Sequence, residues 1–312
     1  MIDIHTHLHF KDYDADRDAV IARAREAGVE KMILVGTDLE SSRTAIALSE
    51  KHDFLFASVG IHPHFFNEVE KEFPISNFQF PNKSQFPISK FQTEIKGITE
   101  LAKHPKVVAI GECGLDYFVR NEQGATNNEQ GGAISNQQKK IQEEGFLAQM
   151  EIAKELGLPL IIHTRPSVGT MDAYEDVFEI LKNHLSLIPH PASAFILHCY
   201  QGDTEITKKL LGLPNAHFSF AGSVTYPVKK SLIGTKDDSS EVVKLVPMER
   251  IFVETDCPYL APQPMRGSRN EPAYVTMTAE RMAETKGTDV KELESTINRV
   301  FSRVFGRSKM ET

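Results

Sequence analysis

The sequence is poor in cysteine and in positive charge, and it lacks long hydrophobic runs. Only three cysteines occur among 312 residues, and no Cys-x-x-Cys pair is present. An odd and sparse set of this kind excludes a disulfide framework and indicates a reducing compartment. The net charge of −8 argues against broad electrostatic binding along duplex DNA, which needs many lysine and arginine contacts. A small phosphate site built on metal ions stays open.

The sequence also shows no pattern typical of a membrane segment or an export signal. No apolar run approaches the roughly 20 residues that a membrane helix needs. The first residues lack the basic stretch and apolar core of a signal peptide. We therefore expect a cytoplasmic protein with no membrane contact, and nothing in the sequence identifies a protein partner.

Short apolar runs alternate with amphipathic segments along the chain. Strands are predicted over 1–7, 31–36, 54–61, 107–112, 158–163, 194–198, 217–221 and 250–255. Helices are predicted over 14–29, 41–51, 137–156, 174–184, 204–211, 239–245, 275–286 and 290–305.

Strands that are mostly separated by helices are typical of parallel β/α units. Eight such units close a (β/α)₈ TIM barrel, whose usual size is about 250 residues. The alternative is a doubly wound open sheet, which gathers its ligand at one switch point. Because polar residues end many different strands here, we predict an α/β fold of the barrel type, with residues 1–312 forming a single domain.

Two stretches do not fit this alternation, and we predict loop insertions at about 73–96 and 119–138. The first holds two copies of Phe-Pro-Ile-Ser-x-Phe-Gln, and the second holds two copies of Asn-Glu-Gln-Gly. Two copies are too few for a solenoid. Both stretches follow predicted strands, where barrel loops tolerate insertion.

Histidines and carboxylates fall at the carboxyl ends of several predicted strands. They are His5, His7, Glu112, His163, His198 and Asp256. A barrel brings these strand ends together at one face, where the active sites of this fold lie. Burying such charges without partners is costly, and divalent metal ions would compensate them. The sequence therefore predicts a metal site at this face.

Four histidines and two carboxylates are more than one ion usually takes. They suit two divalent ions about 3.5–4 Å apart that share a carboxylate, and Glu112 is the expected bridge. Such a pair polarises a phosphoryl or carbonyl oxygen and lowers the pKa of a bridging water toward about 7. Asp256 is predicted to take a proton from that water, so Glu112 and Asp256 are the predicted catalytic residues of a metal-assisted hydrolysis. The ligand types permit zinc, manganese or magnesium.

A thiolate site is an alternative, because each cysteine directly follows a candidate ligand. Strand alternation points Cys113 and Cys199 away from the face that their neighbours use. We expect these two and Cys257 to be small apolar residues of the interior.

Seven short motifs are spread along nearly the whole chain, apart from the two insertions. They are Asp3-Ile4-His5-Thr6-His7-Leu8, Gly60-Ile61-His62-Pro63-His64, Ile110-Gly111-Glu112-Cys113-Gly114-Leu115-Asp116-Tyr117, Ile162-His163-Thr164-Arg165, Leu197-His198-Cys199-Tyr200, Glu254-Thr255-Asp256-Cys257-Pro258-Tyr259-Leu260 and Arg266-Gly267-Ser268-Arg269-Asn270-Glu271-Pro272. In this order they resemble the TatD-like deoxyribonuclease family of the metal-dependent amidohydrolase superfamily. One departure is His9, where the family often has an acidic residue.

The resemblance implies a TIM-like barrel that hydrolyses DNA phosphodiesters with divalent metal. It implies that one ion is held by His5, His7, Glu112 and Asp256. It implies that the other ion is held by Glu112, His163 and His198.

Three neighbouring side chains are candidates for binding substrate phosphate. His64 follows the third predicted strand, and Arg165 and Arg266 offer guanidinium donors that clamp phosphate oxygens. The alternatives are a loop cap for His64 and a structural ion pair for Arg165.

We therefore predict a metal-dependent deoxyribonuclease that acts as an exonuclease on single-stranded DNA or on ends. One alternative is an amide, lactone or ester hydrolase of small molecules on the same binuclear barrel. Relatives of that kind commonly use a carbamylated lysine as the bridge, whereas strand four ends in Glu112 here. The other alternative is a non-catalytic metal-bound binding protein, which the complete ligand set disfavours.

Overall fold

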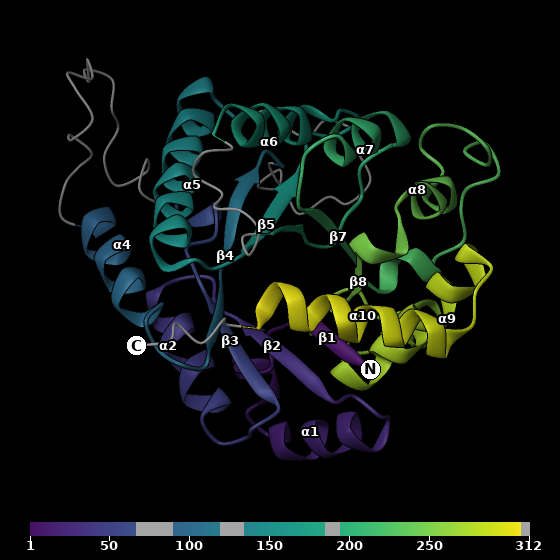
Figure 1. Ribbon diagram of the computed structural model, residues 1–312, viewed down its shortest axis with the longest axis horizontal. Helices are drawn as coiled ribbons and strands as arrows, with labels where there is room; N and C mark the ends of the chain where they lie inside the picture. The colour runs from purple at the N-terminus through teal and green to yellow at the C-terminus, as the bar shows by residue number, and fades with distance from the viewer. Residues whose placement is uncertain (67–89, 119–133, 185–193, 307–312) are drawn as a thin grey trace.

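The computed structural model describes residues 1–66, 90–118, 134–184 and 194–306 (Figure 1). Eight parallel strands form one sheet in which each strand pairs with the next along the chain. They are β1 (Ile2–Thr6), β2 (Lys31–Val35), β3 (Leu55–Val59), β4 (Val107–Asp116), β5 (Leu160–Arg165), β6 (Phe195–Leu197), β7 (Ala216–Phe220) and β8 (Ile251–Val253). The predicted (β/α)₈ barrel is confirmed.

The first strand and the segment after the last strand close the sheet into a barrel. Thr6 forms a parallel bridge with Cys257, and the amide of His7 donates to the carbonyl of Cys257 at 2.9 Å. The amide of Asp256 donates to the carbonyl of His5, also at 2.9 Å. The hydrogen bonds of this closure therefore include His5, His7 and Asp256, which are three of the six predicted metal ligands.

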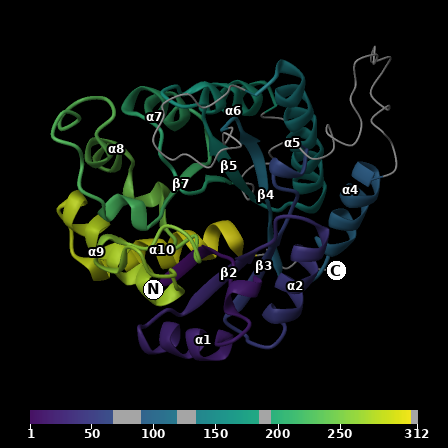
Figure 2. The same cartoon turned by 180° about the vertical axis from the view of Figure 1, so that it is seen from behind.

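Helices surround the strands in both views (Figure 1 and Figure 2). They are α1 (Arg17–Glu26), α2 (Leu39–Ser49), α4 (Lys90–Leu101), α5 (Asn136–Leu156), α6 (Asp172–Asn183), α7 (Thr204–Leu211), α8 (Ser239–Leu245), α9 (Val275–Lys286) and α10 (Val290–Phe305). Side chains that accept hydrogen bonds from first-turn amides define several of the starts, such as Asp38 of α2 and Asp203 of α7. Ser135 and Gln138 form a capping box at the start of α5. No described helix is both long and apolar enough to cross a membrane.

Helix α10 packs where several strands begin. The ring of Phe301 lies 6.0 Å from that of Phe56, and the ring of Phe305 lies 5.6 Å from that of Phe252. The ammonium group of Lys31, the first residue of β2, lies 5.0 Å from the Phe301 ring. The amino-terminal end of the barrel is thus covered by aromatic packing, and the polar cluster lies at the other end.

Two boundaries differ from the predicted ones. Strand β4 continues to Asp116, four residues beyond the predicted end at Glu112. Residues 90–96, which the predicted insertion included, begin α4, because Phe91, Ile95 and Ile98 have the spacing of one helical face. Residues 136–138 begin α5 and residues 134 and 135 precede it, whereas the insertion residues 73–89 and 119–133 lie outside the described part of the chain.

Candidate metal centre

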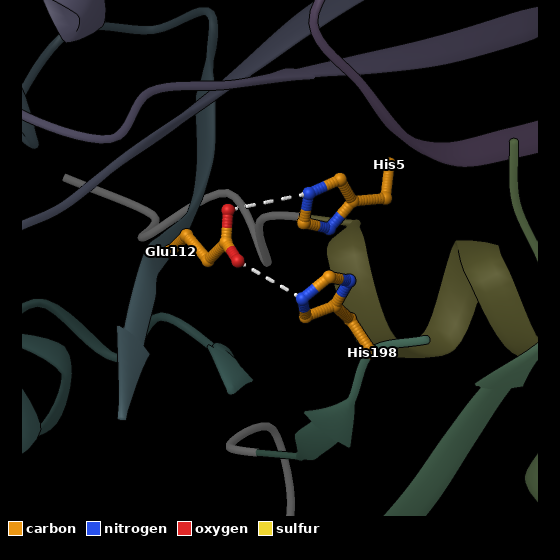
Figure 3. A group of neighbouring side chains, drawn as sticks. All are labelled: His5, Glu112 and His198. Atoms are coloured by element: carbon orange, nitrogen blue, oxygen red, sulfur yellow. Dashed lines mark ion pairs between the residues drawn. The ribbon is translucent and has the colours of Figure 1, made fainter. Parts of the chain in front are cut away.

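The side chain of Glu112 faces His5 with one carboxylate oxygen and His198 with the other, at the carboxyl end of the barrel (Figure 3). Its Oε2 atom is 3.5 Å from Nε2 of His5 and 3.9 Å from Nε2 of His7. Its Oε1 atom is 2.8 Å from Nδ1 of His163 and 2.9 Å from Nε2 of His198. The two oxygens of one carboxylate thus face different pairs of histidines, which is the arrangement that a bridging ligand needs.

Asp256 completes the first of these groups. Its Oδ1 atom lies 3.4 Å from Nε2 of His7 and 3.6 Å from Nε2 of His5. The same two histidine nitrogens are 3.2 Å apart. Ligand atoms of His5, His7 and Asp256 therefore lie close enough together to hold one ion. The structure brings all six predicted ligands into one cluster.

Glycines on either side of Glu112 let β4 lie close against β5. A Cβ atom at Gly111 would meet the backbone oxygen of Ile161 at 2.5 Å, and one at Gly114 would collide with the carbonyl of His163. Both glycines also have positive φ angles, of +148° and +133°. Glycine is thus required at both positions, and the close approach places Glu112 beside His163.

Two residues of the cluster's loops have left-handed backbone although they are not glycine. The φ angle is +54° at Asp256 and +46° at Cys199, which follows His198. Such conformations cost about 1–3 kcal/mol each and are concentrated at functional sites. The backbone strain supports a functional role for these two strand ends.

Burial and charge act in opposite directions on the ionisable groups. Burial alone would raise the pKa of Glu112, but the neighbouring imidazoles of His198 and His62 hold that pKa well below its usual value. Burial alone would lower the pKa of His198, but the charges of Glu112 and Glu254 raise it well above the usual value. The protonated imidazole of His198 and the ionised carboxylate of Glu112 therefore stabilise each other. A bound metal ion would take the place of the protons on the imidazoles.

The donor set fits divalent metal ions. Within the described residues, the ion-pair partners of Glu112 and Asp256 are histidines, with no lysine or arginine among them. The Nδ1 atom of His5 is also buried without a hydrogen-bond partner in the described part of the chain. Buried carboxylates that face several imidazole nitrogens are the ligands that zinc and manganese accept, and the oxygens also suit magnesium.

Outer carboxylates hold the candidate ligands in place. Oδ2 of Asp116 lies 3.0 Å from Nε2 of His163, and Oε1 of Glu254 lies 3.3 Å from Nδ1 of His198. The amide of Cys199 also donates to Oε1 of Glu254, at 2.6 Å. Partners of this kind fix the ring orientation and the tautomer of a metal-binding histidine.

His62 is closer to the cluster than its sequence motif indicates. Its Nε2 atom lies 3.5 Å from Oε1 of Glu112, and its ring centroid is 4.4 Å from that of His163. Burial holds its pKa well below the usual value. The available signal is the spacing in His62-Pro63-His64, which repeats the His-x-His spacing of His5 and His7.

The three predicted phosphate-binding residues lie in different surroundings. His64 is exposed, and its Nε2 atom is 2.8 Å from Oδ2 of Asp116. The guanidinium carbon of Arg165 lies 3.7 Å from the ring centroid of Phe118, and that of Arg266 lies 4.6 Å from the ring centroid of Tyr226.

Neither guanidinium forms an ion pair with a carboxylate in the described part of the chain. The structural ion pair considered for Arg165 is therefore not seen there.

The thiolate alternative finds no support in the described residues. No cysteine belongs to the groups of side chains that converge closely enough to hold an ion there. Burial also raises the pKa of Cys257 to about 12 and raises that of Cys113, so both stay protonated at neutral pH.

A (β/α)₈ barrel with histidines and carboxylates gathered at its strand ends defines a class, the metal-dependent hydrolases of barrel fold. Within this class the chain belongs to the family of TatD-related DNases, whose family model matches residues 2–306. It is an enzyme of the hydrolase class that acts on ester bonds.

Relatives match over almost their full length. The uncharacterized metal-dependent hydrolase YabD of Bacillus subtilis is 35% identical over 305 residues, covering 98% of each chain. The 3′-5′ ssDNA/RNA exonuclease TatD of Escherichia coli K12 is 31% identical over 310 residues, covering 98% of this chain and 99% of its own. The crystal structure of YJJV, a TatD homologue from E. coli K12, matches with a TM-score of 0.75 at 22% identity and 98% coverage of both chains.

Proposed function

We propose that this protein is a nuclease that hydrolyses DNA phosphodiester bonds, acting as an exonuclease on single strands or ends. The observation that carries the proposal is Glu112, whose two oxygens face separate pairs of histidines. The name of the E. coli relative, a 3′-5′ ssDNA/RNA exonuclease, supports the substrate class.

Two divalent ions, of zinc, manganese or magnesium, are the proposed cofactors. The proposed ligands of the first are His5, His7, Glu112 and Asp256, and those of the second are Glu112, His163 and His198. When bound, such ions polarise a phosphoryl oxygen and make a water nucleophilic at neutral pH.

Two further roles fall to side chains of the protein, which are accepting a proton and orienting the histidine rings. Asp256 is half-buried beside His5 and His7, and its carboxylate would accept a proton from the attacking water. Asp116 and Glu254 keep the rings of His163 and His198 in one orientation during the reaction.

Substrate phosphate would be held at the rim of the cluster. His64 is exposed, and its Nε2 atom faces Oδ2 of Asp116. The same buried carboxylate oxygen also faces Nε2 of His163, so each of the two rings donates an N–H to Asp116. Arg165 and Arg266, each stacked on an aromatic ring, offer paired N–H donors to phosphate oxygens.

The test uses single-stranded DNA oligomers labelled at the 5′ or the 3′ end. The purified protein is assayed with chelator and with added Mg²⁺, Mn²⁺ or Zn²⁺, beside Asp256→Ala and a control variant, His217→Leu. We expect laddering of the 5′-labelled strand with metal only, early release of a labelled mononucleotide from the 3′-labelled strand, and loss of both in Asp256→Ala.

The control variant should cleave like the wild type, because His217 lies at the other end of the barrel. No cleavage with any metal, while metal stays bound and a small ester or lactone is hydrolysed, would contradict the proposal. It would instead favour a small-molecule hydrolase on the same barrel.

A further inference from the structure

Large apolar side chains that stay exposed lie on one end of the barrel. In the described residues they are Val168, Ile233 and Tyr259, which follow β5, β7 and β8 respectively. This is the end that carries the histidine–carboxylate cluster. Single exposed apolar residues need no explanation, but Tyr259 is the aromatic member and is 54% exposed.

Tyr259 lies directly beside a proposed metal ligand. Its ring centroid is 6.3 Å from that of His7, in an edge-on arrangement with an interplanar angle of 69°. The ring of Phe10 also stacks on that of His7, at 4.5 Å. The exposed tyrosine is therefore within the reach of one nucleotide from the cluster.

The backbone around Tyr259 is tied down. Its carbonyl accepts a hydrogen bond from the side chain of Asn270 at 2.5 Å, and its amide donates to the carbonyl of Asp256 at 3.0 Å. Asn270 is fully buried and also donates to the carbonyl of Thr255. Left-handed residues precede and follow the tyrosine, with φ of +54° at Asp256 and +53° at Leu260. The ring is thus presented from a fixed loop.

We infer that Tyr259 is a stacking platform for the nucleobase next to the phosphodiester that is cleaved. The inference rests on the proposed nuclease function and specifies how the same site recognises its substrate. Aromatic rings bind bases of any sequence, because every base has a π-face. A tyrosine ring held by a fixed loop loses little conformational entropy on binding. The site would then distinguish nucleotide diesters from diesters without a base.

The experiment compares Tyr259→Ala, Tyr259→Phe and a matched control, Ile233→Ala, an exposed residue of the same barrel end. The substrates are a single-stranded DNA oligomer and the same oligomer with an abasic tetrahydrofuran residue at the cleaved end. We expect Tyr259→Ala to raise KM on the normal oligomer roughly 5- to 150-fold with little change in kcat, because stacking contributes equally before and during the reaction. Tyr259→Phe and Ile233→Ala should behave like the wild type.

On the abasic oligomer the difference in KM between wild type and Tyr259→Ala should disappear. An equal loss on both oligomers, or an unchanged KM on the normal one, would overturn the inference. In the first case Tyr259 would have only a structural role.

A binding measurement separates this inference from the nuclease proposal. An oligomer with 2-aminopurine at its end reports stacking as quenched fluorescence, whether or not it is cleaved. Quenching by the wild type and not by Tyr259→Ala supports the platform even if no metal gives cleavage, which would overturn the nuclease proposal alone. Cleavage with no difference in quenching would overturn the platform alone, and neither binding nor cleavage would overturn both.

Discussion

Both ends of the barrel bury a histidine, and the two surroundings have opposite effects on it. At the amino-terminal end, Nδ1 of His217 lies 2.9 Å from the carbonyl oxygen of Asn215, and burial lowers its pKa to about 4. At the carboxyl end, His198 is equally buried, yet Glu112 and Glu254 raise its pKa well above the usual value. Burial is therefore common to both, and the charged neighbours distinguish them: carboxylates face His198, whereas Arg303 and Arg250 lie near His217 and also lower its pKa.

A buried histidine is therefore a candidate metal ligand only when its neighbours include carboxylates. His217 packs 5.7 Å from the ring of Phe252, in the region that α10 covers with aromatic rings. His198 lies where the ends of five strands, β1, β4, β5, β6 and β8, contribute polar residues to one cluster. Changing single groups at each end tests this contrast.

The largest effect is expected from Glu112→Gln. The amide has the same shape but lacks the charge and one of the two acceptor oxygens that face the histidine pairs. We expect activity to fall roughly 10⁴-fold or more, and the content of bound metal to fall with it. Steady-state kinetics together with elemental analysis of the purified protein checks this, and a variant that keeps full metal and activity would refute the bridging role.

A smaller loss is expected from Asp256→Asn. This change keeps the size of the side chain but removes the carboxylate that is proposed to accept the proton of the attacking water. We expect kcat to fall roughly 10³-fold with a smaller effect on KM. The measurement is kcat across pH, where the acidic limb of the wild-type profile should be lost. An unchanged pH profile would assign the proton transfer to another group.

Glu254→Gln should weaken the site without removing a ligand. The amide oxygen can still accept the hydrogen bond from Cys199, but the charge that acts on His198 is lost. We expect metal affinity to fall about 10- to 100-fold, with activity restored at high metal concentration. Titration of activity with Mn²⁺ measures the effect, and a loss that added metal does not restore would argue against this positioning role.

His217→Leu should leave activity unchanged and alter only the acid stability. The pKa of His217 is near 4 in the folded protein and about 6.5 in the unfolded chain, so the unfolded state binds more protons between these values. Wild-type stability should therefore decrease by roughly 3 kcal/mol as the pH falls from 6.5 to 4 through this group. Urea unfolding across that range should show a shallower decrease in the variant. A change in kcat would show that His217 also affects the reaction, which would contradict the difference between the two ends of the barrel.

The position of the site was predictable because barrel topology brings all carboxyl strand ends together. Several short apolar runs end in a polar residue, and this pattern predicts the positions of His5, His7, His163 and His198. The detailed arrangement around Glu112 was not predictable. It depends on two glycine contacts and on a shift in register between Ile110 and Cys113.

The details that lie outside the predicted site residues have the same origin. Asp116 belongs to the candidate site because β4 continues past Glu112, so that Glu112 and Asp116 share one face of the strand. The distance of His62 from Glu112 depends on how the loop after β3 folds back, which residue spacing does not determine. The start of α4 was hidden by the repeated Phe-Pro-Ile-Ser-x-Phe-Gln sequence, whose last three residues are the first three of the helix.

Counting bound metal tests whether this cluster holds two ions that share Glu112 as a ligand. Protein stripped with chelator is titrated with Mn²⁺ by calorimetry, beside His163→Ala and the control His217→Leu. We expect two ions per chain in the wild type and the control, and one ion in His163→Ala. A single ion in the wild type, or two ions in His163→Ala, would contradict this expectation.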